Sequence, residues 1–170
     1  MIVARRVLGI DPGTRVAGYA CLERPATGRA AAPGGAGAVI LEAGVWRLDA
    51  SRGVPDRLVE LEADMSQAIE RLRPEAVAVE ALYSRPKNVA TAIVMAHARG
   101  VILLAARRAG LPVIELRATQ VKKSLTGSGH AAKHQMQRAV QSAFALAEPP
   151  SPPDVADAIA VALCGLNRAA

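Results

Sequence analysis

Residues 3–14, VARRVLGIDPGT, join an apolar segment to a turn and constrain how the rest of the chain can fold. The segment Val3–Ile10 has the aliphatic composition of a buried strand, and DPGT at 11–14 is a strong turn signal. A second apolar segment, Val16–Glu23, follows directly. The two apolar segments therefore predict an antiparallel hairpin whose turn begins at the acid Asp11.

After the hairpin the chain adds one strand and then changes to alternating helices and strands. The sequence Gly28–Gly37, GRAAAPGGAG, is small and aperiodic, as is typical of an exposed loop, and it leads into a third predicted strand at Val39–Leu48. Beyond Ser51 the apolar residues recur at helical spacing as far as Pro74. The further predicted elements are a strand at Ala76–Val79 that ends at Glu80, a helix at about Asn88–Arg108, a strand at Pro112–Leu116, a helix at about Ala131–Phe144 and a final helix from near Asp154.

This order of elements predicts one α/β domain that covers residues 1–170. Three antiparallel strands, followed by helices that alternate with parallel strands, give a mixed five-stranded sheet with helices on both faces. The 51% of hydrophobic residues is enough for a packed core. Charged residues interrupt the apolar runs, Cys21 and Cys164 are the only thiols, and the first residues lack a signal-peptide pattern. We therefore expect a cytoplasmic protein that does not enter a membrane.

The net charge favours a polyanionic partner. The chain has 21 Lys and Arg against 15 Asp and Glu, a formal net charge of +6, and a compact domain of this sign commonly binds nucleic acid. A positive surface without such a partner is equally compatible with the composition. Aromatic residues make up only 2%, which is too few for a series of base-stacking platforms. Any bound nucleic acid would therefore be held mainly through its backbone. The aromatic residues are Tyr19, Trp46, Tyr83 and Phe144.

Four carboxylates stand where an α/β sheet presents functional side chains. Asp11 follows the first predicted strand and Glu80 ends a later one. Asp154 and Asp157 are three residues apart on the last predicted helix and therefore share a face. Carboxylates without a His or Cys set favour oxygen-liking cations, Mg²⁺ first. Two such ions about 4 Å apart can clamp the attacking and leaving oxygens of a phosphodiester.

Each acid also has a purely structural interpretation. Asp11 is explained equally well as the first residue of a turn, and Asp154 as the partner of Ser151 in a helix capping box. Glu80 is harder to explain in this way, because a hydrophobic strand seldom ends in a carboxylate without a partner. The apolar sequence AIAVAL after Asp157 indicates that this face of the helix turns toward the sheet. Together the four acids form a much stronger pattern than any one of them.

Four segments in sequence order resemble the RuvC-type Holliday junction resolvases. They are VLGIDPGT at 7–14, VAVEALYSRPKNVATA at 77–92, ATQVKKSLTGSGHAAK at 118–133 and PPDVADAIAVA at 152–162. The resemblance covers nearly the whole chain and leaves only the GRAAAPGGAG region unmatched. It implies an RNase H-like fold, a homodimer, and Mg²⁺-dependent cutting of two opposing strands of a four-way DNA junction in recombination and repair. It also implies a partnership with the RuvA–RuvB branch-migration complex.

The resemblance assigns the acidic residues by position. The family's catalytic and metal-binding acids fall on Asp11, Glu80, Asp154 and Asp157. These residues would hold two Mg²⁺ ions, with Mn²⁺ as a substitute. Members of the family carry either Asp or His at the third of these positions, and this chain has Asp154. An all-oxygen site leans further toward Mg²⁺ than a site that contains His.

The resemblance also assigns residues that meet DNA. An aromatic residue at the junction centre falls on Tyr83, and catalytic lysines beside the scissile strand fall on Lys122 and Lys133. The basic sequence SRPK after Tyr83 indicates an exposed loop. The structural alternatives are that Tyr83 is a ring in the core and that the lysines are solvated surface charges. The predicted DNA-binding set is Tyr83, Arg85, Lys87, Lys122, Lys123 and Lys133.

Lys122 and Lys133 flank a Gly-Ser-Gly loop at 127–129, where backbone amides and ammonium groups could meet the same phosphate. The loop lacks the GK[ST] sequence of an NTPase. No carboxylate or Cys stands at ligand spacing beside the histidines, which we interpret as non-ligands: His97, His130 and His134.

The predicted helix Asn88–Arg108 is apolar on more than one side, which indicates burial on two sides. A second copy of the chain is a natural cover for one side, and a central core helix is the alternative. The apolar residues are Val89, Ile93, Val94, Met95, Val101, Ile102, Leu103 and Leu104.

Two other functions are compatible with parts of the pattern. Actin-like or sugar-kinase-like phosphotransferases also open with a strand and a D-x-G-T turn, but their fold generally needs two lobes, and 170 residues supply one at most. A DNA-binding protein without activity is the other alternative, against which the intact set of four acids argues. ATP hydrolysis without DNA would favour the phosphotransferase, whereas metal-dependent cutting of a synthetic junction would favour the nuclease.

Overall fold

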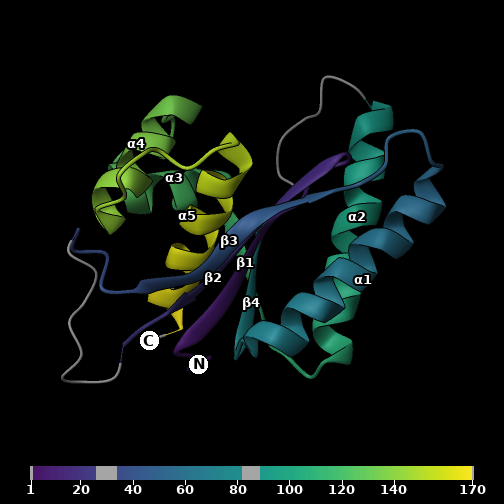
Figure 1. Ribbon diagram of the computed structural model, residues 1–170, viewed down its shortest axis with the longest axis horizontal. Helices are drawn as coiled ribbons and strands as arrows, with labels where there is room; N and C mark the ends of the chain where they lie inside the picture. Colours follow the sequence, from purple (N-terminus) through teal and green to yellow (C-terminus); the bar gives the residue numbers. More distant parts are fainter. Residues whose placement is uncertain (1, 26–33, 82–88, 170) are drawn as a thin grey trace.

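A mixed β-sheet forms the centre of the molecule (Figure 1). The computed structural model describes residues 2–25, 34–81 and 89–169. Within these residues the sheet has the order β3-β2-β1-β4-β5, with β1–β2 and β2–β3 antiparallel and β1–β4 and β4–β5 parallel. The predicted mixed sheet is therefore confirmed. The strands are β1 Arg6–Asp11, β2 Val16–Glu23, β3 Val39–Arg47, β4 Ala76–Ala81 and β5 Val113–Arg117.

Helices cover both faces of the sheet, as predicted. Figure 1 shows α1 and α2 on one face and α3, α4 and α5 on the other. The helix α3 was not expected, because its nine residues, ATQVKKSLT, are too few and too polar to show a clear apolar period. The helices are α1 Val54–Leu72, α2 Val89–Arg108, α3 Ala118–Thr126, α4 Lys133–Phe144 and α5 Pro153–Arg168.

The first strand begins later than its apolar composition predicts. The expected strand Val3–Ile10 is observed as β1 at Arg6–Asp11, and Val3 is 77% exposed. The amide of Ala4 donates to the carbonyl of Ala169, 3.0 Å away, so this segment is tied to the end of α5 rather than to a neighbouring strand. An apolar run alone cannot distinguish these two partners.

Successive side chains of a strand point to opposite faces of the sheet, and this alternation along β1 and β4 places both strand-end acids on the same face. Val7 packs in the core beneath α3, α4 and α5, whereas Leu8 packs in the core beneath α1 and α2. Asp11 lies in phase with Val7, and Glu80 lies in phase with Ala78, which belongs to the same core as Val7. The two acids therefore lie on the face that α5 covers.

Glycines allow α5 to lie against the backbone of the central strands. A Cβ atom on Gly9 of β1 would overlap the backbone of Ala162, and one on Gly18 of β2 would overlap the carbonyl of Asp154. Neither position tolerates a side chain while α5 keeps its place. The absence of these two side chains thus sets the distance between α5 and the sheet.

By length and apolar composition, α2 is a helix that could cross a membrane, and among the described residues it is the only such helix. The expectation that charged residues interrupt every apolar run holds here too, because Arg99 divides the apolar residues of α2. In this fold, however, α2 packs along α1 and contacts β5, and its Arg99 makes contacts within the protein. Its own chain nevertheless leaves several apolar side chains of α2 exposed, among them Val89, Ile93 and Leu104.

Replacing Gly9 with Ala should destabilise the protein, because the added methyl group overlaps the backbone of α5. We expect a loss of about 2–3 kcal/mol, or roughly 5–10 °C in Tm, by differential scanning calorimetry. The control Gly53→Ala lies where a Cβ meets only ordinary contacts and should cost at most about 1 kcal/mol. Equal Tm values for the two variants would contradict the close approach of α5.

Candidate active site

The carboxyl edge of the sheet brings Asp11 and Glu80 together. The parallel register pairs Ile10 with Val79, so the two acids follow on neighbouring strands. Both side chains are partly buried. Functional groups in α/β proteins commonly gather at this edge, beyond the carboxyl ends of the strands. The two predicted strand-end acids therefore share one site.

Asp157 reaches the same place from α5. Gly18 pairs with Asp11 across β1 and β2, and the carbonyl of Asp154 lies over Gly18. The first turn of α5 is consequently held beside Asp11. Asp157 is 24% exposed and lines the same cavity as Asp11 and Glu80. Its helix face turns toward the sheet, as the apolar residues after it predicted.

Asp154 lies near this site but does not line the cavity. Its negative charge contributes to the raised pKa values of Asp11 and Asp157. The predicted capping box with Ser151 is wrong, because the residue before the first turn is Pro152 and no side chain caps the helix. Asp154 does stand in the first turn of α5, where the helix dipole favours an acid.

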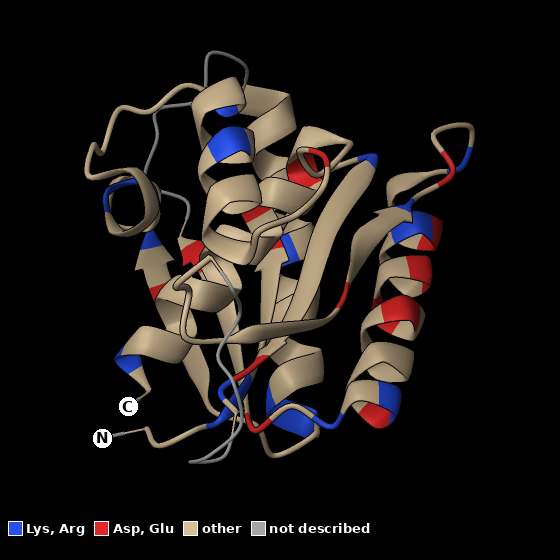
Figure 2. Ribbon diagram, turned by 60° about the vertical axis from the view of Figure 1, so that its left-hand side comes forward, with Lys and Arg blue, Asp and Glu red and all other residues tan. Residues whose placement is uncertain are grey.

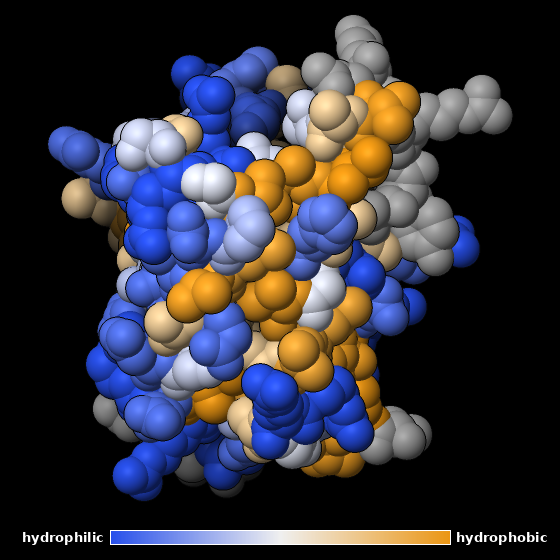
Figure 3. Space-filling model, turned by 90° about the vertical axis from the view of Figure 1, so that its right-hand side faces the viewer, coloured by the Kyte–Doolittle hydropathy of each residue, from blue (hydrophilic) through white to orange (hydrophobic). Residues whose placement is uncertain are grey.

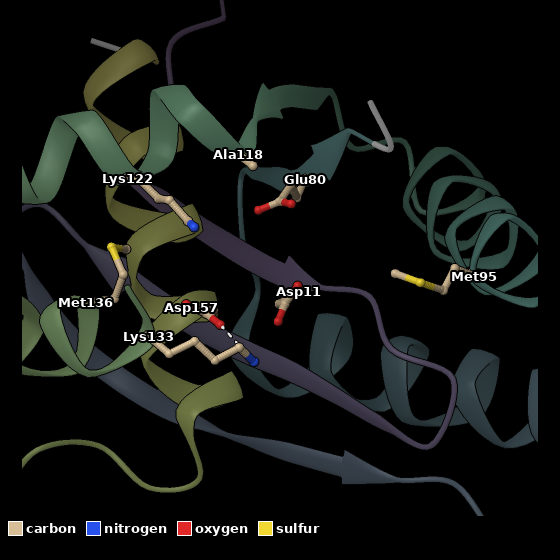
Figure 4. A pocket seen from close by; sticks show the side chains of 8 residues that line it. All are labelled: Asp11, Glu80, Met95, Ala118, Lys122, Lys133, Met136 and Asp157. Carbon is tan, nitrogen blue, oxygen red and sulfur yellow. Dashed lines mark ion pairs between the residues drawn. The ribbon is translucent and has the colours of Figure 1, made fainter. Parts of the chain in front are cut away.

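Two lysines approach the carboxylates from α3 and α4. Lys122 lies on α3, which begins directly after β5, and Lys133 is the first residue of α4. The Nζ atom of Lys133 is 3.9 Å from Oδ2 of Asp157. The charge of Lys122 opposes the burial that raises the pKa values of Glu80 and Asp157. Figure 4 shows both lysine side chains extending toward the carboxylates.

The Gly-Ser-Gly loop between these lysines does not present the amides that we expected. The amide of Gly127 donates to the carbonyl of Lys123 at 2.9 Å, and the amide of Ser128 donates to Oγ1 of Thr126 at 3.2 Å. A phosphate contact through these two amides is therefore wrong. The reason is the unexpected helix α3, whose last carbonyls need a C-terminal cap, and Gly127 supplies it in the left-handed conformation.

A cavity of about 320 Å³ lies among these groups (Figure 4). Met95 of α2, Ala118 at the start of α3 and Met136 of α4 complete its wall. The sequence alone groups Met95 with the apolar residues of its helix, because a methionine at helical spacing carries no signature of a site. The lining residues are Asp11, Glu80, Met95, Ala118, Lys122, Lys133, Met136 and Asp157.

Burial and mutual repulsion hold the carboxyl groups toward their neutral forms. Burial, followed by the charges of Asp157, Glu80 and Asp154, raises the pKa of Asp11 to about 8. Burial and the charge of Asp157 raise the pKa of Glu80. Burial also raises the pKa of Asp157, and the ammonium group of Lys133 opposes this shift. A cation in the cavity would favour the ionised carboxylates, so this electrostatic arrangement suits a metal ion.

The donor set fits a hard divalent ion that is completed by other oxygens. No group of three or more His, Cys, Asp and Glu side chains in the described chain lies close enough to hold a single ion. Mg²⁺ is usually bound by one or two carboxylates, together with water and substrate phosphate. The cavity offers carboxylates on three elements and no thiolate or imidazole ligand among its lining residues, and the thioethers of Met95 and Met136 are poor ligands for a hard ion. This chemistry matches such an ion.

Other predicted site residues lie elsewhere or outside the described chain. Tyr83, Arg85 and Lys87 fall within 82–88, which is outside the described residues. Lys123 is exposed on α3 and does not line the cavity. The histidines at 97, 130 and 134 are exposed and do not line it either.

Arg99 of α2 supports the strand that carries Glu80, a role that the sequence did not indicate. Its Nε atom donates to the carbonyl of Glu80 at 3.3 Å, and its Nη2 atom donates to the carboxylate of Glu115 on β5. The side chain is only 17% exposed. Arg99 thus joins α2, β4 and β5 at the edge of the cavity. The available signal was that Arg99 interrupts the apolar part of the helix, whereas Arg107 and Arg108 stand at its end.

The sheet order and the carboxylates on β1, β4 and α5 define a nuclease of the RNase H-like class. The chain belongs to the RuvC family, whose model, described as crossover junction endodeoxyribonuclease RuvC, matches residues 7–165. Nucleases of this family depend on divalent metal ions. The predicted resemblance is therefore confirmed, and the phosphotransferase alternative is excluded.

Relatives match along almost the whole chain. The crossover junction endodeoxyribonuclease RuvC of Moorella thermoacetica is 44% identical over 158 residues, covering 93% of this chain and 89% of that protein. That of Rhodopirellula baltica is 42% identical over 159 residues, covering 94% and 84%. A structure of Thermus thermophilus RuvC in complex with a Holliday junction substrate matches with a TM-score of 0.82 at 31% identity, covering 97% and 95%. The predicted RNase H-like fold is confirmed.

The metal-free protein should lose stability as the pH rises from about 4 to 8. The pKa of Asp11 is raised from 3.8 to about 8, so the folded state binds this proton more tightly than the unfolded state does. The resulting stabilisation is complete below the unfolded pKa and is lost as the pH passes through the folded one. In EDTA at pH 8, Asp11→Asn should raise Tm by roughly 3–8 °C, or about 1–3 kcal/mol. Identical Tm values for wild type and variant at pH 8 would show that ionised Asp11 does not destabilise the folded protein, which contradicts the raised pKa.

Arg99→Met should lower the rate of metal-dependent DNA cleavage roughly tenfold and raise the metal concentration at half-maximal rate, because the backbone at Glu80 loses its support. Arg99→Lys should restore part of the rate. The control Glu115→Gln removes only the outer ion pair, whose carboxylate is 58% exposed, and should have little effect. A metal titration equal to that of wild type would show that Arg99 does not position Glu80.

Proposed function

We propose that this protein is a structure-selective endonuclease that resolves four-way (Holliday) DNA junctions. It hydrolyses one phosphodiester on each of two opposing strands during homologous recombination and repair. The observation that carries this proposal is the cavity in which Asp11, Glu80 and Asp157 face Lys122 and Lys133. Membership of the RuvC family and similarity to a junction-bound relative support the choice of substrate.

We propose Mg²⁺ as the cofactor, with two ions in each site and Mn²⁺ as a substitute. Asp11, Glu80 and Asp157 border the cavity, and Asp154 is close enough to act on the pKa of Asp11, so these four residues would hold the ions. The bound ions would activate a water and stabilise the leaving 3′-oxygen. Asp11 is central to the set, because its pKa responds to all three other acids.

The protein's own side chains contribute charge and position. Lys122 and Lys133 would counter the additional negative charge that develops on the phosphate during hydrolysis. Lys133 now lies 3.9 Å from Asp157 and would share its ammonium group between this carboxylate and the phosphate. Met95 and Met136 form an apolar part of the wall, which limits the access of bulk water and strengthens the electrostatic interactions inside.

DNA would be held mainly by its phosphates at the carboxyl edge of the sheet. Tyr19 stacks on Trp46 with ring centroids 4.7 Å apart, and Phe144 is buried, so these rings are engaged in packing. Beyond Arg57, the charged residues of α1 are mainly acidic (Figure 2), so this part of the helix is a poor surface for DNA. Tyr83 would act at the junction centre. The proposed basic contacts are Arg85, Lys87, Lys122, Lys123 and Lys133.

A second copy of the chain would cover the outer face of α2. Val89 is 70% exposed, and Ile93 and Leu104 are each 51% exposed. Figure 3 shows apolar side chains gathered on this side of the molecule. A four-way junction has two-fold symmetry, and paired cuts require two active sites related by the same symmetry, which an isologous dimer provides. We therefore propose a homodimer built on α2.

The remaining parts of the proposal concern context. We propose that residues 1–170 form a single nuclease domain that works in the cytoplasm. Its junctions would be delivered by the RuvA–RuvB branch-migration complex. Support for these statements comes from the cysteine content and from the family.

Asp11→Asn should cut a synthetic four-way junction at least about a hundredfold more slowly than wild type, on the order of the ~3 kcal/mol lost with a key electrostatic group. It should bind the junction as tightly as wild type, or slightly more tightly without Mg²⁺, because a negative charge near DNA is removed. A gel shift and a cleavage time course on one labelled junction measure both quantities.

Linear duplex is the control for this experiment. Binding should fall steeply with salt in both proteins, because counterion release drives phosphate contacts. Undiminished cutting by Asp11→Asn would refute the metal site, and equal affinity for linear duplex would refute the junction assignment.

Ile93→Glu should convert the dimer into a monomer and abolish paired cutting, because a charge is then buried in the interface on α2. Sedimentation at micromolar concentration measures the mass. The control Val3→Glu changes an equally aliphatic residue that is 77% exposed and should remain dimeric. A wild-type monomer, with and without junction DNA, would end the dimer proposal.

A further inference from the structure

A second cavity, of about 220 Å³, lies beside the turn between β1 and β2. Arg15 at the end of this turn and Arg57 in the first turns of α1 supply its charged groups, and no acidic residue lines it. The cavity is open to solvent on one side, since Arg15 is exposed. The lining residues are Thr14, Arg15, Arg57, Ala90, Thr91 and Val94.

The guanidinium group of Arg57 is fixed but not neutralised. Its Nη1 atom donates to the carbonyl of Thr14 at 2.6 Å. Its Nε atom is buried and has no hydrogen-bond partner among the described residues. A partly buried cation with an unused donor is costly unless another group compensates it. The turn thus holds a positive charge in a set position.

The chain itself supplies no counter-ion for this pair of arginines. Neither Arg15 nor Arg57 forms an ion pair within the described residues. The residues outside that part, 1, 26–33, 82–88 and 170, contain no Asp or Glu. A negatively charged group of another molecule would therefore meet no competing carboxylate in this cavity. Guanidinium groups, planar and rich in donors, are well suited to phosphate.

This second cavity adjoins the active site along two elements. The turn that begins with Asp11 in the first cavity ends with Arg15 in the second. On α2, Val94 lines the second cavity and the next residue, Met95, lines the first. A polyanion that enters the active site is therefore within reach of both cavities. Small isolated anions would not exploit this arrangement.

We propose that the cavity of Arg15 and Arg57 binds a backbone phosphodiester of the junction other than the one that is cut. This proposal rests on the proposed resolvase function and extends it with a second phosphate site. Arg57 provides a fixed guanidinium, and Arg15 closes on the phosphate from the exposed side. The site orients the strand relative to Asp11 without taking part in hydrolysis.

The test compares wild type, Arg15→Gln and the matched control Arg108→Gln, which removes the same charge at the far end of α2. Arg57 is left intact, because its bond to Thr14 supports the turn next to Asp11. Fluorescence anisotropy in EDTA measures the Kd of a labelled four-way junction over a salt series. Arg15→Gln should bind roughly tenfold more weakly, with a salt slope smaller by about 1. Arg108→Gln should match wild type.

A set of junctions with one neutral methylphosphonate each then locates the phosphate. One substitution, away from the cut, should weaken binding by wild type and leave the Kd of Arg15→Gln unchanged. An unaltered Kd and salt slope for Arg15→Gln, with normal cutting by wild type, would overturn this site alone. Wild type that cuts no junction would overturn the resolvase function and this ligand together.

Inorganic phosphate distinguishes a DNA phosphate from a free anion. If phosphate raised the Tm of wild type but not of Arg15→Gln, while both bound the junction equally, the cavity would be a small-anion site and the DNA assignment would be overturned. No effect of phosphate on Tm, with weaker junction binding by Arg15→Gln, is the expected result.

Discussion

The contact between α5 and the backbone of the central strands sets the geometry of the whole active site. Glycine at positions 9 and 18 allows this helix to approach the sheet more closely than any side chain would permit. Gly18 is paired with Asp11 in the hairpin, so the helix descends beside the acid at the end of the central strand. As a result, Asp157 belongs to the same cavity as Asp11. A helix one side chain further from the sheet would separate the two carboxylates.

This close packing works against the electrostatics of the site. It concentrates negative charge where burial already disfavours ionisation, which raises the pKa values of Asp11, Glu80 and Asp157. The hydrophobic contacts on both faces of the sheet hold the arrangement in spite of this repulsion. Electrostatic repulsion that is maintained by hydrophobic packing is typical of functional sites. In the function that we propose, it prepares the carboxylates for cations and, through the lysines, for a phosphate.

The sequence predicted the parts of this account that have a strong periodic or chemical signature. The sheet and its directions follow from apolar strands with a clear turn at 11–14, and the carboxylates stand out at strand ends. The short polar helix α3 left no periodic signal, so the role of Gly127 as its cap was missed. Met95 and Arg99 act through tertiary contacts between α2 and the strands. Such contacts cannot be recognised before the helix is placed on the sheet.

We propose that the carboxylates on β1, β4 and α5 hold divalent ions in one cavity. Anomalous X-ray scattering from crystals of the wild-type protein soaked in Mn²⁺ tests it most directly. We expect manganese peaks in the cavity that Asp11, Glu80 and Asp157 line, and none there in Asp11→Asn crystals treated in the same way. Manganese bound only elsewhere on a protein that cuts junctions with Mn²⁺ would contradict the account.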